Sequence, residues 1–316
     1  MKNLMWAPLL ALAFVLATGA QAPSNARPTW AFLVPDKDQP SAQESSAMIH
    51  VPGSAKGYTA AEIDDLSNPP DWFPDEHGLL PRVVQGGSGS SVLACGACHL
   101  MSGQGHPESA DIAGMPVEYL VRQMADFKNG TRKDPARMNA IGKVTSAEDS
   151  HTAAEWFAAL KPTVWVKVQE STSVPKSYVA AKGRMRLPLP SGGTEPLGNR
   201  IVELPQDAAR ATSRDPHSGF VAYVPPGSIA KGQKLATTGG AGKTIACTIC
   251  HGDSLKGLGD VPRIAGLHPI YIVRQLYQFQ GSDYSGTSAA LMKKVVANLN
   301  EDDMLAIAAY AASLEP

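Results

Sequence analysis

The chain contains four cysteines, and all of them lie in two copies of one pattern, Cys-x-x-Cys-His. The first copy is Cys95-Gly96-Ala97-Cys98-His99, and the second, 152 residues later, is Cys247-Thr248-Ile249-Cys250-His251. Two thiols separated by two residues can add to the two vinyl groups of one haem, and the histidine that follows then reaches the iron from one side. The pattern therefore predicts two covalently bound haem c groups, with His99 and His251 as iron ligands.

Two Cys-x-x-Cys pairs could also bind zinc or act as redox-active dithiols. Zinc ribbons usually bring their two pairs within a few tens of residues of each other, and neither zinc sites nor thioredoxin-like pairs need a histidine after each pair. Here each pair carries its own histidine and lies in its own repeat. These facts favour haem attachment, with zinc and dithiol chemistry as the alternatives.

The similarity between the two halves of the chain extends beyond the cysteines. At an offset of 152 residues, four pairs of segments or side chains align: Ile112-Ala113-Gly114 with Ile264-Ala265-Gly266, Tyr119 with Tyr271, Val121-Arg122-Gln123 with Val273-Arg274-Gln275, and Phe127 with Phe279. After two inserted residues the offset becomes 154, which pairs Met138 with Met292. The pattern indicates a duplicated domain, over residues 79–162 and 227–316.

Each copy has the sequence pattern of a helical domain. Residues 119–127 and 271–279 have apolar side chains at helical spacing, and 229–235 is typical of an opening helix in which Gly232 would let another helix approach closely. Ser146 and Asn300 are N-cap residues ahead of acidic first turns, so each should begin the last helix of its copy. We therefore predict a mainly α fold with two tandem helical haem domains.

Two segments lie outside the repeat. Residues 23–78 form an extension rich in proline and polar residues, with one short helix predicted over 59–66. Residues 163–226 link the copies, and three stretches in them have the pattern of short strands: 164–168, 200–204 and 219–224. A structureless linker of this length would be unusual in a compact protein. We expect it to fold back over the haem domains as a small β layer, with a loosely ordered tether as the alternative.

The N-terminal residues 1–22 have the features of an export signal. Lys2 precedes an apolar stretch and then small residues, and cleavage could follow Ala20 or Ala22. An uncleaved anchor is the alternative, although the apolar stretch is short for a bilayer. Loss of Lys2 changes the formal net charge from −1 to about −2. We expect a periplasmic protein without a membrane span after signal removal, and nothing suggests nucleic acid as a partner.

The repeat also predicts the second axial ligand of each iron. Met138 and Met292 hold equivalent positions, each in a loop ahead of the final helix that could fold over the second haem face. A thioether there gives a six-coordinate electron carrier, whereas an open position would bind gas or peroxide. Three other methionines of the first copy have no methionine counterpart: Met101, Met115 and Met124. His106 and His268 also lack histidine counterparts, and we expect both at the surface.

These motifs resemble those of the class I cytochromes c, in the tandem two-haem form known as the c4 type. The resemblance implies two small helical bundles in which the cysteine pair holds the haem, the adjacent histidine is the proximal ligand and the late methionine is the distal ligand. By this resemblance the two sites are Cys95, Cys98, His99 and Met138, and Cys247, Cys250, His251 and Met292. It also implies that the carbonyl of Pro262 accepts a hydrogen bond from the proximal histidine, a place that Ala110 occupies in the first copy.

Four side chains on the predicted helices are candidate donors to haem propionates: Tyr119, Arg122, Tyr271 and Arg274. Arginine pairs well with carboxylates, although all four could instead stabilise the helix surface.

The predicted function is electron transfer without catalysis. The donor would be a dehydrogenase or a quinol-oxidising complex, and the acceptor a terminal oxidase or another cytochrome. A permanent haem subunit of a periplasmic dehydrogenase is one alternative, which the two extra segments favour. A dihaem peroxidase, a sulfur-compound oxidase or a gas sensor is another, although such proteins usually need an open iron or an unusual ligand.

Overall fold

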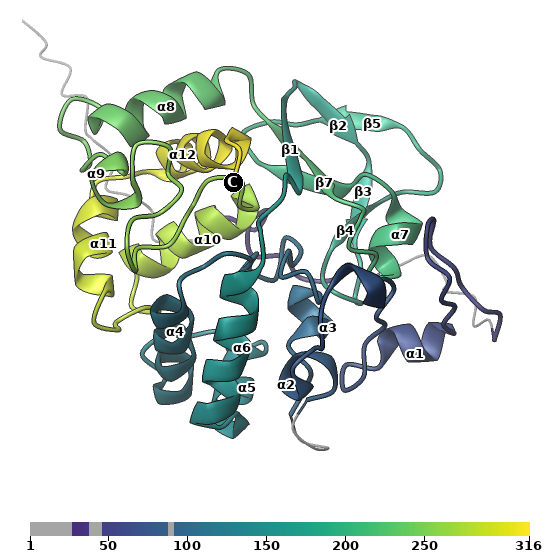
Figure 1. Ribbon diagram of the computed structural model, residues 1–316. Helices are drawn as coiled ribbons and strands as arrows, with labels where there is room; N and C mark the ends of the chain where they lie inside the picture. The colour runs from purple at the N-terminus through teal and green to yellow at the C-terminus, as the bar shows by residue number, and fades with distance from the viewer. Residues whose placement is uncertain (1–26, 38–45, 88–91) are drawn as a thin grey trace, which may run out of the picture.

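The computed structural model describes residues 27–37, 46–87 and 92–316, so the predicted signal peptide lies outside the described residues. In Figure 1 the first copy of the repeat lies at the bottom and the second copy at the upper left. The linker lies at the upper right, and the N-terminal extension lies below it. No helix in the described ranges is long and apolar enough to cross a membrane.

The first copy is a bundle of helices, as its sequence predicts. Its helices are α2 (Arg82–Gln85), α3 (Gly96–His99), α4 (Val117–Asn129), α5 (Met138–Val144) and α6 (Ala147–Ala159). Helix α4 packs against both α5 and α6. The predicted cap of α6 is confirmed, because the Ser146 hydroxyl accepts a hydrogen bond from the Asp149 backbone N–H at 2.9 Å. This bond satisfies a backbone donor that the helix itself cannot, and so fixes where α6 begins.

The second copy is also a bundle of helices, with a longer opening helix than the first. Its helices are α8 (Ser228–Thr238), α9 (Thr248–His251), α10 (Pro269–Gln280), α11 (Ala289–Val296) and α12 (Glu301–Ser313). The opening helix α8 packs on the final helix α12 at Gly232, where a Cβ atom would lie 1.9 Å from the Ala306 carbonyl oxygen. Only glycine permits this approach, so the predicted role of Gly232 is confirmed. Asn300 caps α12 as predicted, in a capping box with Asp303.

The linker is folded, so the alternative prediction of a loosely ordered tether is wrong. Its elements are β1 (Val166–Glu170), β2 (Ser173–Pro175), β3 (Ser177–Val179), β4 (Arg186–Pro188), β5 (Thr194–Pro196), β6 (Val202–Pro205), α7 (Ala208–Thr212) and β7 (Phe220–Val224). The three predicted strands correspond to β1, β6 and β7. They form one sheet in the order β1-β7-β6, with β1 parallel and β6 antiparallel to β7. The pairs β2–β5 and β3–β4 escaped prediction because three residues are too few to show alternation.

The N-terminal extension packs against the linker. Its predicted helix is confirmed as α1 (Ala60–Asp64), which begins with a capping box between Thr59 and Glu62, and a short 3₁₀ turn, η1, follows at Pro74–Glu76. The buried indole of Trp72 donates a hydrogen bond to the Ser213 carbonyl at 2.8 Å. Two segments that flank the first copy in sequence are thus joined in space.

The two copies pack about an approximate two-fold axis. Asp111 and Arg263 are 152 residues apart, and they form a buried ion pair with 2.7 Å between Oδ1 and Nη2. Arg132 and Tyr284, also 152 residues apart, pair as an isolated antiparallel β-bridge. Equivalent residues can meet in this way only close to an axis that exchanges the two copies. One continuous core, including Phe157 of the first copy and buried side chains of α8, α10 and α12 in the second, runs through both.

Candidate haem sites

Each Cys-x-x-Cys-His motif forms a single helical turn. The first cysteine of each pair, Cys95 or Cys247, immediately precedes the short helix, and the second lies one turn later. Residues one turn apart share a face of a helix, so both thiols of a pair point the same way. The spacing therefore presents two attachment points on one surface.

The thiols do not suit dithiol redox chemistry. Burial raises the pKa of the Cys95 thiol to about 12 and that of the Cys247 thiol to about 11. A redox-active pair needs a lowered pKa, because the thiolate is the nucleophile. The two cysteine pairs also lie in different copies, and nowhere in the described ranges do three or more His, Cys, Asp or Glu side chains gather as a metal site.

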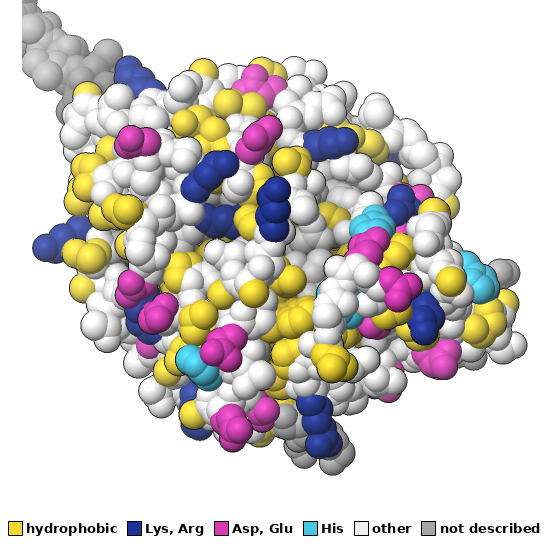
Figure 2. Space-filling view, in the orientation of Figure 1, with side chains coloured by type: hydrophobic (Ala, Val, Ile, Leu, Met, Phe, Trp, Pro, Cys, Tyr) yellow, Lys and Arg dark blue, Asp and Glu magenta, His cyan; other side chains and the backbone are white. Residues whose placement is uncertain are grey.

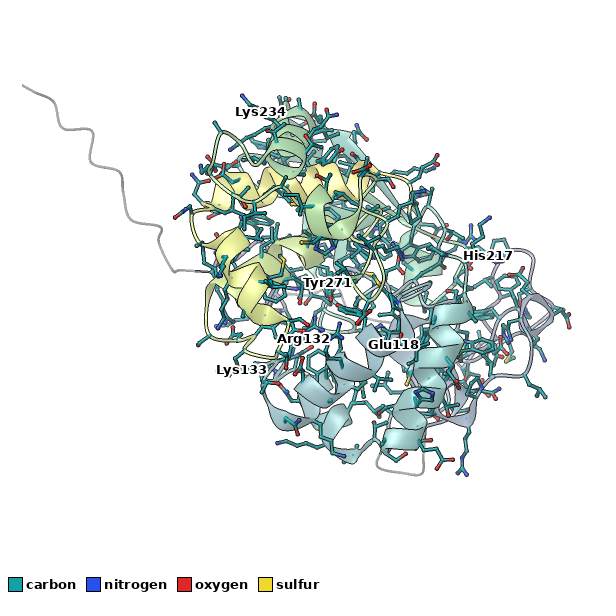
Figure 3. The ribbon with its side chains drawn as sticks, turned by 60° about the vertical axis from the view of Figure 1, so that its left-hand side comes forward. Glu118, Arg132, Lys133, His217, Lys234 and Tyr271 are labelled. Atoms are coloured by element: carbon teal, nitrogen blue, oxygen red, sulfur yellow. The ribbon has the colours of Figure 1, made fainter. Side chains whose placement is uncertain are left out.

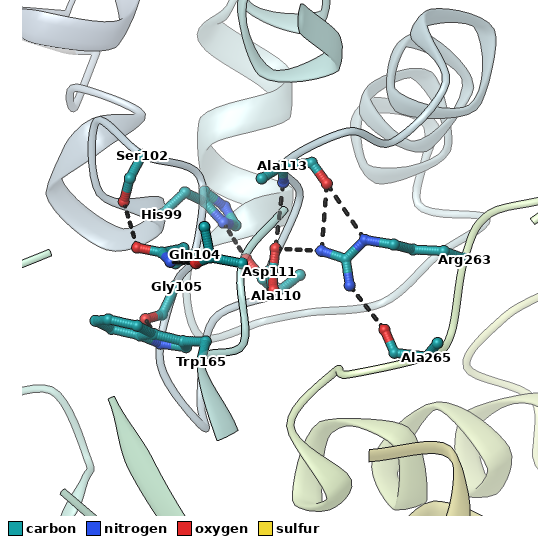
Figure 4. Close-up of polar contacts among 11 residues, drawn as sticks. His99, Ser102, Gln104, Gly105, Ala110, Asp111, Ala113, Trp165, Arg263 and Ala265 are labelled. Carbon is teal, nitrogen blue, oxygen red and sulfur yellow. Dashed lines mark hydrogen bonds and ion pairs between the residues drawn. The ribbon is translucent and has the colours of Figure 1, made fainter. Parts of the chain in front are cut away.

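Both histidines are oriented by backbone carbonyls, as the resemblance implies. His99 Nδ1 lies 2.7 Å from the Ala110 carbonyl oxygen, and His251 Nδ1 lies 2.8 Å from that of Pro262. Figure 4 shows the first of these bonds beside the Asp111–Arg263 ion pair. A carbonyl accepts only from a protonated nitrogen, so Nε2 is left unprotonated and available as a ligand. Two thiols and an oriented imidazole on one turn fit a covalently attached haem.

The two methionines lie on helices rather than in loops. Met138 is the first residue of α5, and Met292 lies within α11, which differs from the predicted loop position. Both side chains are half-buried. Met292 packs against the same core as Cys247 and Tyr271. Each methionine is still in the element directly before the final helix of its copy, as the repeat predicts.

Arg122 and Arg274 both reach across to the other copy. Arg274 is buried, and its guanidinium pairs with Glu108 and donates to the Pro107 carbonyl at 2.5 Å. Arg122 lies 3.5 Å from Asp260. Asp260 is the counterpart of Glu108, so the two ion pairs are related by the repeat. That Arg122 and Arg274 bind haem propionates stays a prediction.

The sequence comparison missed Arg132, which organises a polar cluster between the copies. Its side chain is buried and donates to Gln123 and Gln275, both at 2.6 Å, and to the Tyr271 hydroxyl at 3.0 Å. Figure 3 shows Arg132 next to Tyr271. Tyr119 belongs to the same cluster, and burial raises its pKa, so its hydroxyl stays protonated. Arg132 has tyrosine as its counterpart, so comparison of the repeats could not single it out.

Comparison with known proteins identifies the family. No family model matches the chain. It is 35% identical over 86 residues to cytochrome c-554(547) of Halothiobacillus neapolitanus, which covers 24% of this chain and 94% of that protein. The chain belongs to the class I cytochromes c.

This cytochrome is also similar to longer relatives. It is 24% identical over 245 residues to cytochrome c4 of Pseudomonas aeruginosa, with 75% of this chain and 92% of that protein covered. It is 25% identical over 227 residues to the thiosulfate dehydrogenase electron acceptor of Thiomonas intermedia, with 70% and 79% covered. Among solved structures, the thiosulfate dehydrogenase TsdBA of Marichromatium purpuratum has a TM-score of 0.49 at 24% identity, and the match covers 73% of this chain but only 38% of that one. The cytochrome is an electron-transfer protein that uses haem c.

The expectation that His268 of this cytochrome lies at the surface is wrong. Its side chain is 1% exposed, and Nδ1 lies 2.6 Å from Glu203 Oε2. The other carboxylate oxygen of Glu203 accepts the Ile270 backbone N–H at 2.7 Å. Glu203 comes from strand β6 of the linker, so repeat comparison contained no sign of this burial. His106 is half-buried, and its ring nitrogen accepts the Glu108 backbone N–H at 3.2 Å.

A cavity of about 520 Å³ lies where the first copy, the extension and the linker meet. Trp72, His77, Met101, Trp165 and His217 are among the residues that line it. The predicted haem ligands are not in its lining. Gly96, which lies inside the first Cys-x-x-Cys-His motif, also lines the cavity, so the cavity borders the first haem-attachment turn.

Proposed function

We propose that the protein is a periplasmic dihaem electron carrier with one haem c in each copy of the repeat. The proposed axial ligands are His99 and Met138 in the first copy and His251 and Met292 in the second. When bound, each haem supplies a one-electron couple, and the protein tunes it. The observation that best supports this proposal is the matched pair of histidine–carbonyl hydrogen bonds, at 2.7 and 2.8 Å in the two copies.

The residues around each site would tune the properties of its haem and would not themselves take part in a reaction. A carbonyl that accepts from Nδ1 holds the imidazole ring in one orientation and raises its basicity, which strengthens Nε2 as a ligand. Tyr119, Tyr271 and Arg132 are the donors that we propose for haem propionates, because all three are clustered between the copies. Arg122 and Arg274 would reach a propionate only by giving up their partners in the other copy.

Three measurements on the secreted protein test this proposal. Intact mass should exceed that of the mature polypeptide by two haem groups. A redox titration should show two one-electron steps. The reduced protein should not bind carbon monoxide, because both irons are six-coordinate. A mass equal to that of the bare polypeptide would refute the proposal, and carbon monoxide binding would refute the methionine assignment.

A second candidate is the electron acceptor of a sulfur-compound dehydrogenase. It is favoured by the relative from Thiomonas intermedia, whose name describes an acceptor for thiosulfate dehydrogenase and of which the match covers 79%. The test mixes the oxidised cytochrome with thiosulfate and purified thiosulfate dehydrogenase, and follows haem reduction by absorbance. Reduction that needs both the enzyme and thiosulfate supports this role. A native complex with a large catalytic subunit would instead support the permanent haem subunit.

A further inference from the structure

The two haem-attachment turns differ in what covers them. Ile249, in the middle of the second motif, is 67% exposed, whereas its counterpart Ala97 is fully buried. The second cysteine of each motif follows the same trend, because Cys250 is exposed and Cys98 is only half-buried. Both copies carry the Cys-x-x-Cys-His pattern, but segments outside the repeat contact the turn of the first copy.

The extension and the linker cover the Cys-x-x-Cys-His turn of the first copy. The Leu66 carbonyl of the extension accepts the Ala94 backbone N–H at 3.0 Å. Arg214 of the linker donates to the Ala97 carbonyl, and its Nε donates to the Ile63 carbonyl of the extension at 2.9 Å. Arg214 therefore joins both added segments to the motif. A partner could not approach this side of the first copy without displacing them.

The second copy presents an apolar patch in the corresponding place. Ile245, Ile249 and Leu291 are 43%, 67% and 68% exposed. Thr244 donates to the Val295 carbonyl at 2.6 Å, which holds the segment carrying Ile245 against α11. Figure 2 shows hydrophobic side chains at the left of the molecule, in the region of α9 and α11. Exposed large apolar side chains that gather in this way mark an interaction surface.

The segments that carry this patch are rich in lysine. The segments 239–259 and 286–298 contain four lysines and one aspartate, although the whole chain has a formal net charge of −1. Lys293 and Lys294 are exposed on α11, and no ion pair is formed by either within the described ranges. Lys243 pairs with Asp303 but keeps part of its side chain exposed. A surface with an apolar centre and a basic rim complements one with an apolar centre and an acidic rim.

We propose that electrons enter and leave this protein through one docking face on the second copy. The face consists of Ile245, Ile249 and Leu291 with the rim lysines Lys243, Lys293 and Lys294, and its partner is a redox protein with carboxylates around an apolar centre. The first copy takes no part in docking, because the extension and the linker cover its motif. This inference rests on the proposed function and names the partner surface for it.

The test compares charge changes on the two copies. Ile249→Asp and the double variant Lys293→Glu/Lys294→Glu alter the proposed face. Leu79→Asp and Lys128→Glu/Lys143→Glu are the matched controls, because these exposed side chains lie outside it and give the same changes in charge. Reduced plastocyanin, which has an acidic patch, serves as the redox probe, and its second-order rate constant is measured at low and high salt.

We expect each face variant to lower the rate constant at low salt by about tenfold or more, and each control by less than about twofold. Mass-spectrometric lysine acetylation gives a second readout, in which an excess of plastocyanin should protect Lys293 and Lys294 but not Lys128. Equal effects of face and control variants, or protection of Lys128, would overturn the proposal. Absorption spectra of all variants are recorded first. Intact haem spectra with unaffected rates would refute the docking face alone, whereas missing haem in the unmodified protein would refute the proposed function.

Discussion

Asp111 and Arg263 occupy the same position in the two copies of the repeat and form a buried ion pair with each other. Each directly follows the residue whose carbonyl lies within hydrogen-bond distance of a motif histidine, Ala110 beside His99 and Pro262 beside His251. Arg263 also donates to the Ala265 carbonyl at 2.8 Å. The ion pair therefore connects the supports of the two histidines across the interface between the copies.

Breaking this ion pair on one side should be costly. Asp111→Ala leaves Arg263 buried without its charge partner, and we expect the free energy of unfolding to fall by about 3–5 kcal/mol. The double variant Asp111→Leu/Arg263→Met removes both charges and should be closer to the unmodified protein. Chemical denaturation of the holoprotein measures both. A loss below about 1 kcal/mol for Asp111→Ala would show that the pair does not hold the interface.

The contact between α8 and α12 should depend on the absence of a side chain at position 232. Gly232→Ala improves helix propensity by about 1 kcal/mol. Its Cβ would however meet the Ala306 carbonyl oxygen, so we expect a net loss of about 2–3 kcal/mol in unfolding free energy. Gly78→Ala is the control, because no atom lies within 4 Å of the added Cβ and its backbone φ is not positive. A stabilising effect of Gly232→Ala would contradict the close approach.

The cap of α12 should make stability depend on pH. Burial raises the pKa of Asp303, but hydrogen bonds from Lys243, the Asn300 backbone N–H and Lys231 outweigh it and bring the pKa below its ordinary value of 3.8. A lowered pKa means that the folded state favours the carboxylate. This stabilisation is present above the ordinary value and is lost as pH falls through the lower, folded-state pKa.

Asp303→Asn should therefore lower the free energy of unfolding at pH 7 by about 1.5–3 kcal/mol, which is typical of hydrogen bonds to a charged group. The difference from the unmodified protein should shrink as pH falls below 3.8. Glu148→Gln, at an exposed position in the first turn of α6, should change stability by less than about 0.5 kcal/mol. A difference that is the same at pH 7 and at pH 3 would rule out the carboxylate as its cause.

The proposed assignment of Met138 and Met292 as iron ligands makes a spectroscopic prediction. Met138→Ala and Met292→Ala should each reduce the methionine–iron charge-transfer band of the oxidised protein and lower the potential of one haem. Met115→Leu is the control, because Met115 is buried in the core and a leucine of similar volume replaces it. An undiminished band in Met292→Ala would mean that another side chain is the sixth ligand of the second iron.

The sequence by itself determined the chemistry of this protein and its local structure. The cysteine pairs, the adjacent histidines and the caps at Ser146 and Asn300 all depend on residues near in sequence or on spacings that a helix fixes. The resemblance added the carbonyl acceptors, Ala110 and Pro262. These features were predictable because short-range geometry follows from backbone periodicity and from the need to satisfy backbone donors.

Only the tertiary structure decided how the two copies pack against each other and which of the two haem motifs is covered by other segments. Comparing the repeats aligned Asp111 with Arg263, but alignment does not show that equivalent residues touch. Arg132 and Glu203 were missed for the same reason, because their partners lie in segments distant in sequence. The linker strands were visible as a pattern, whereas their placement over the first haem motif depends on Arg214 and on packing with the extension. Such long-range contacts are selected by the shape and charge of the assembled surfaces, which no local pattern encodes.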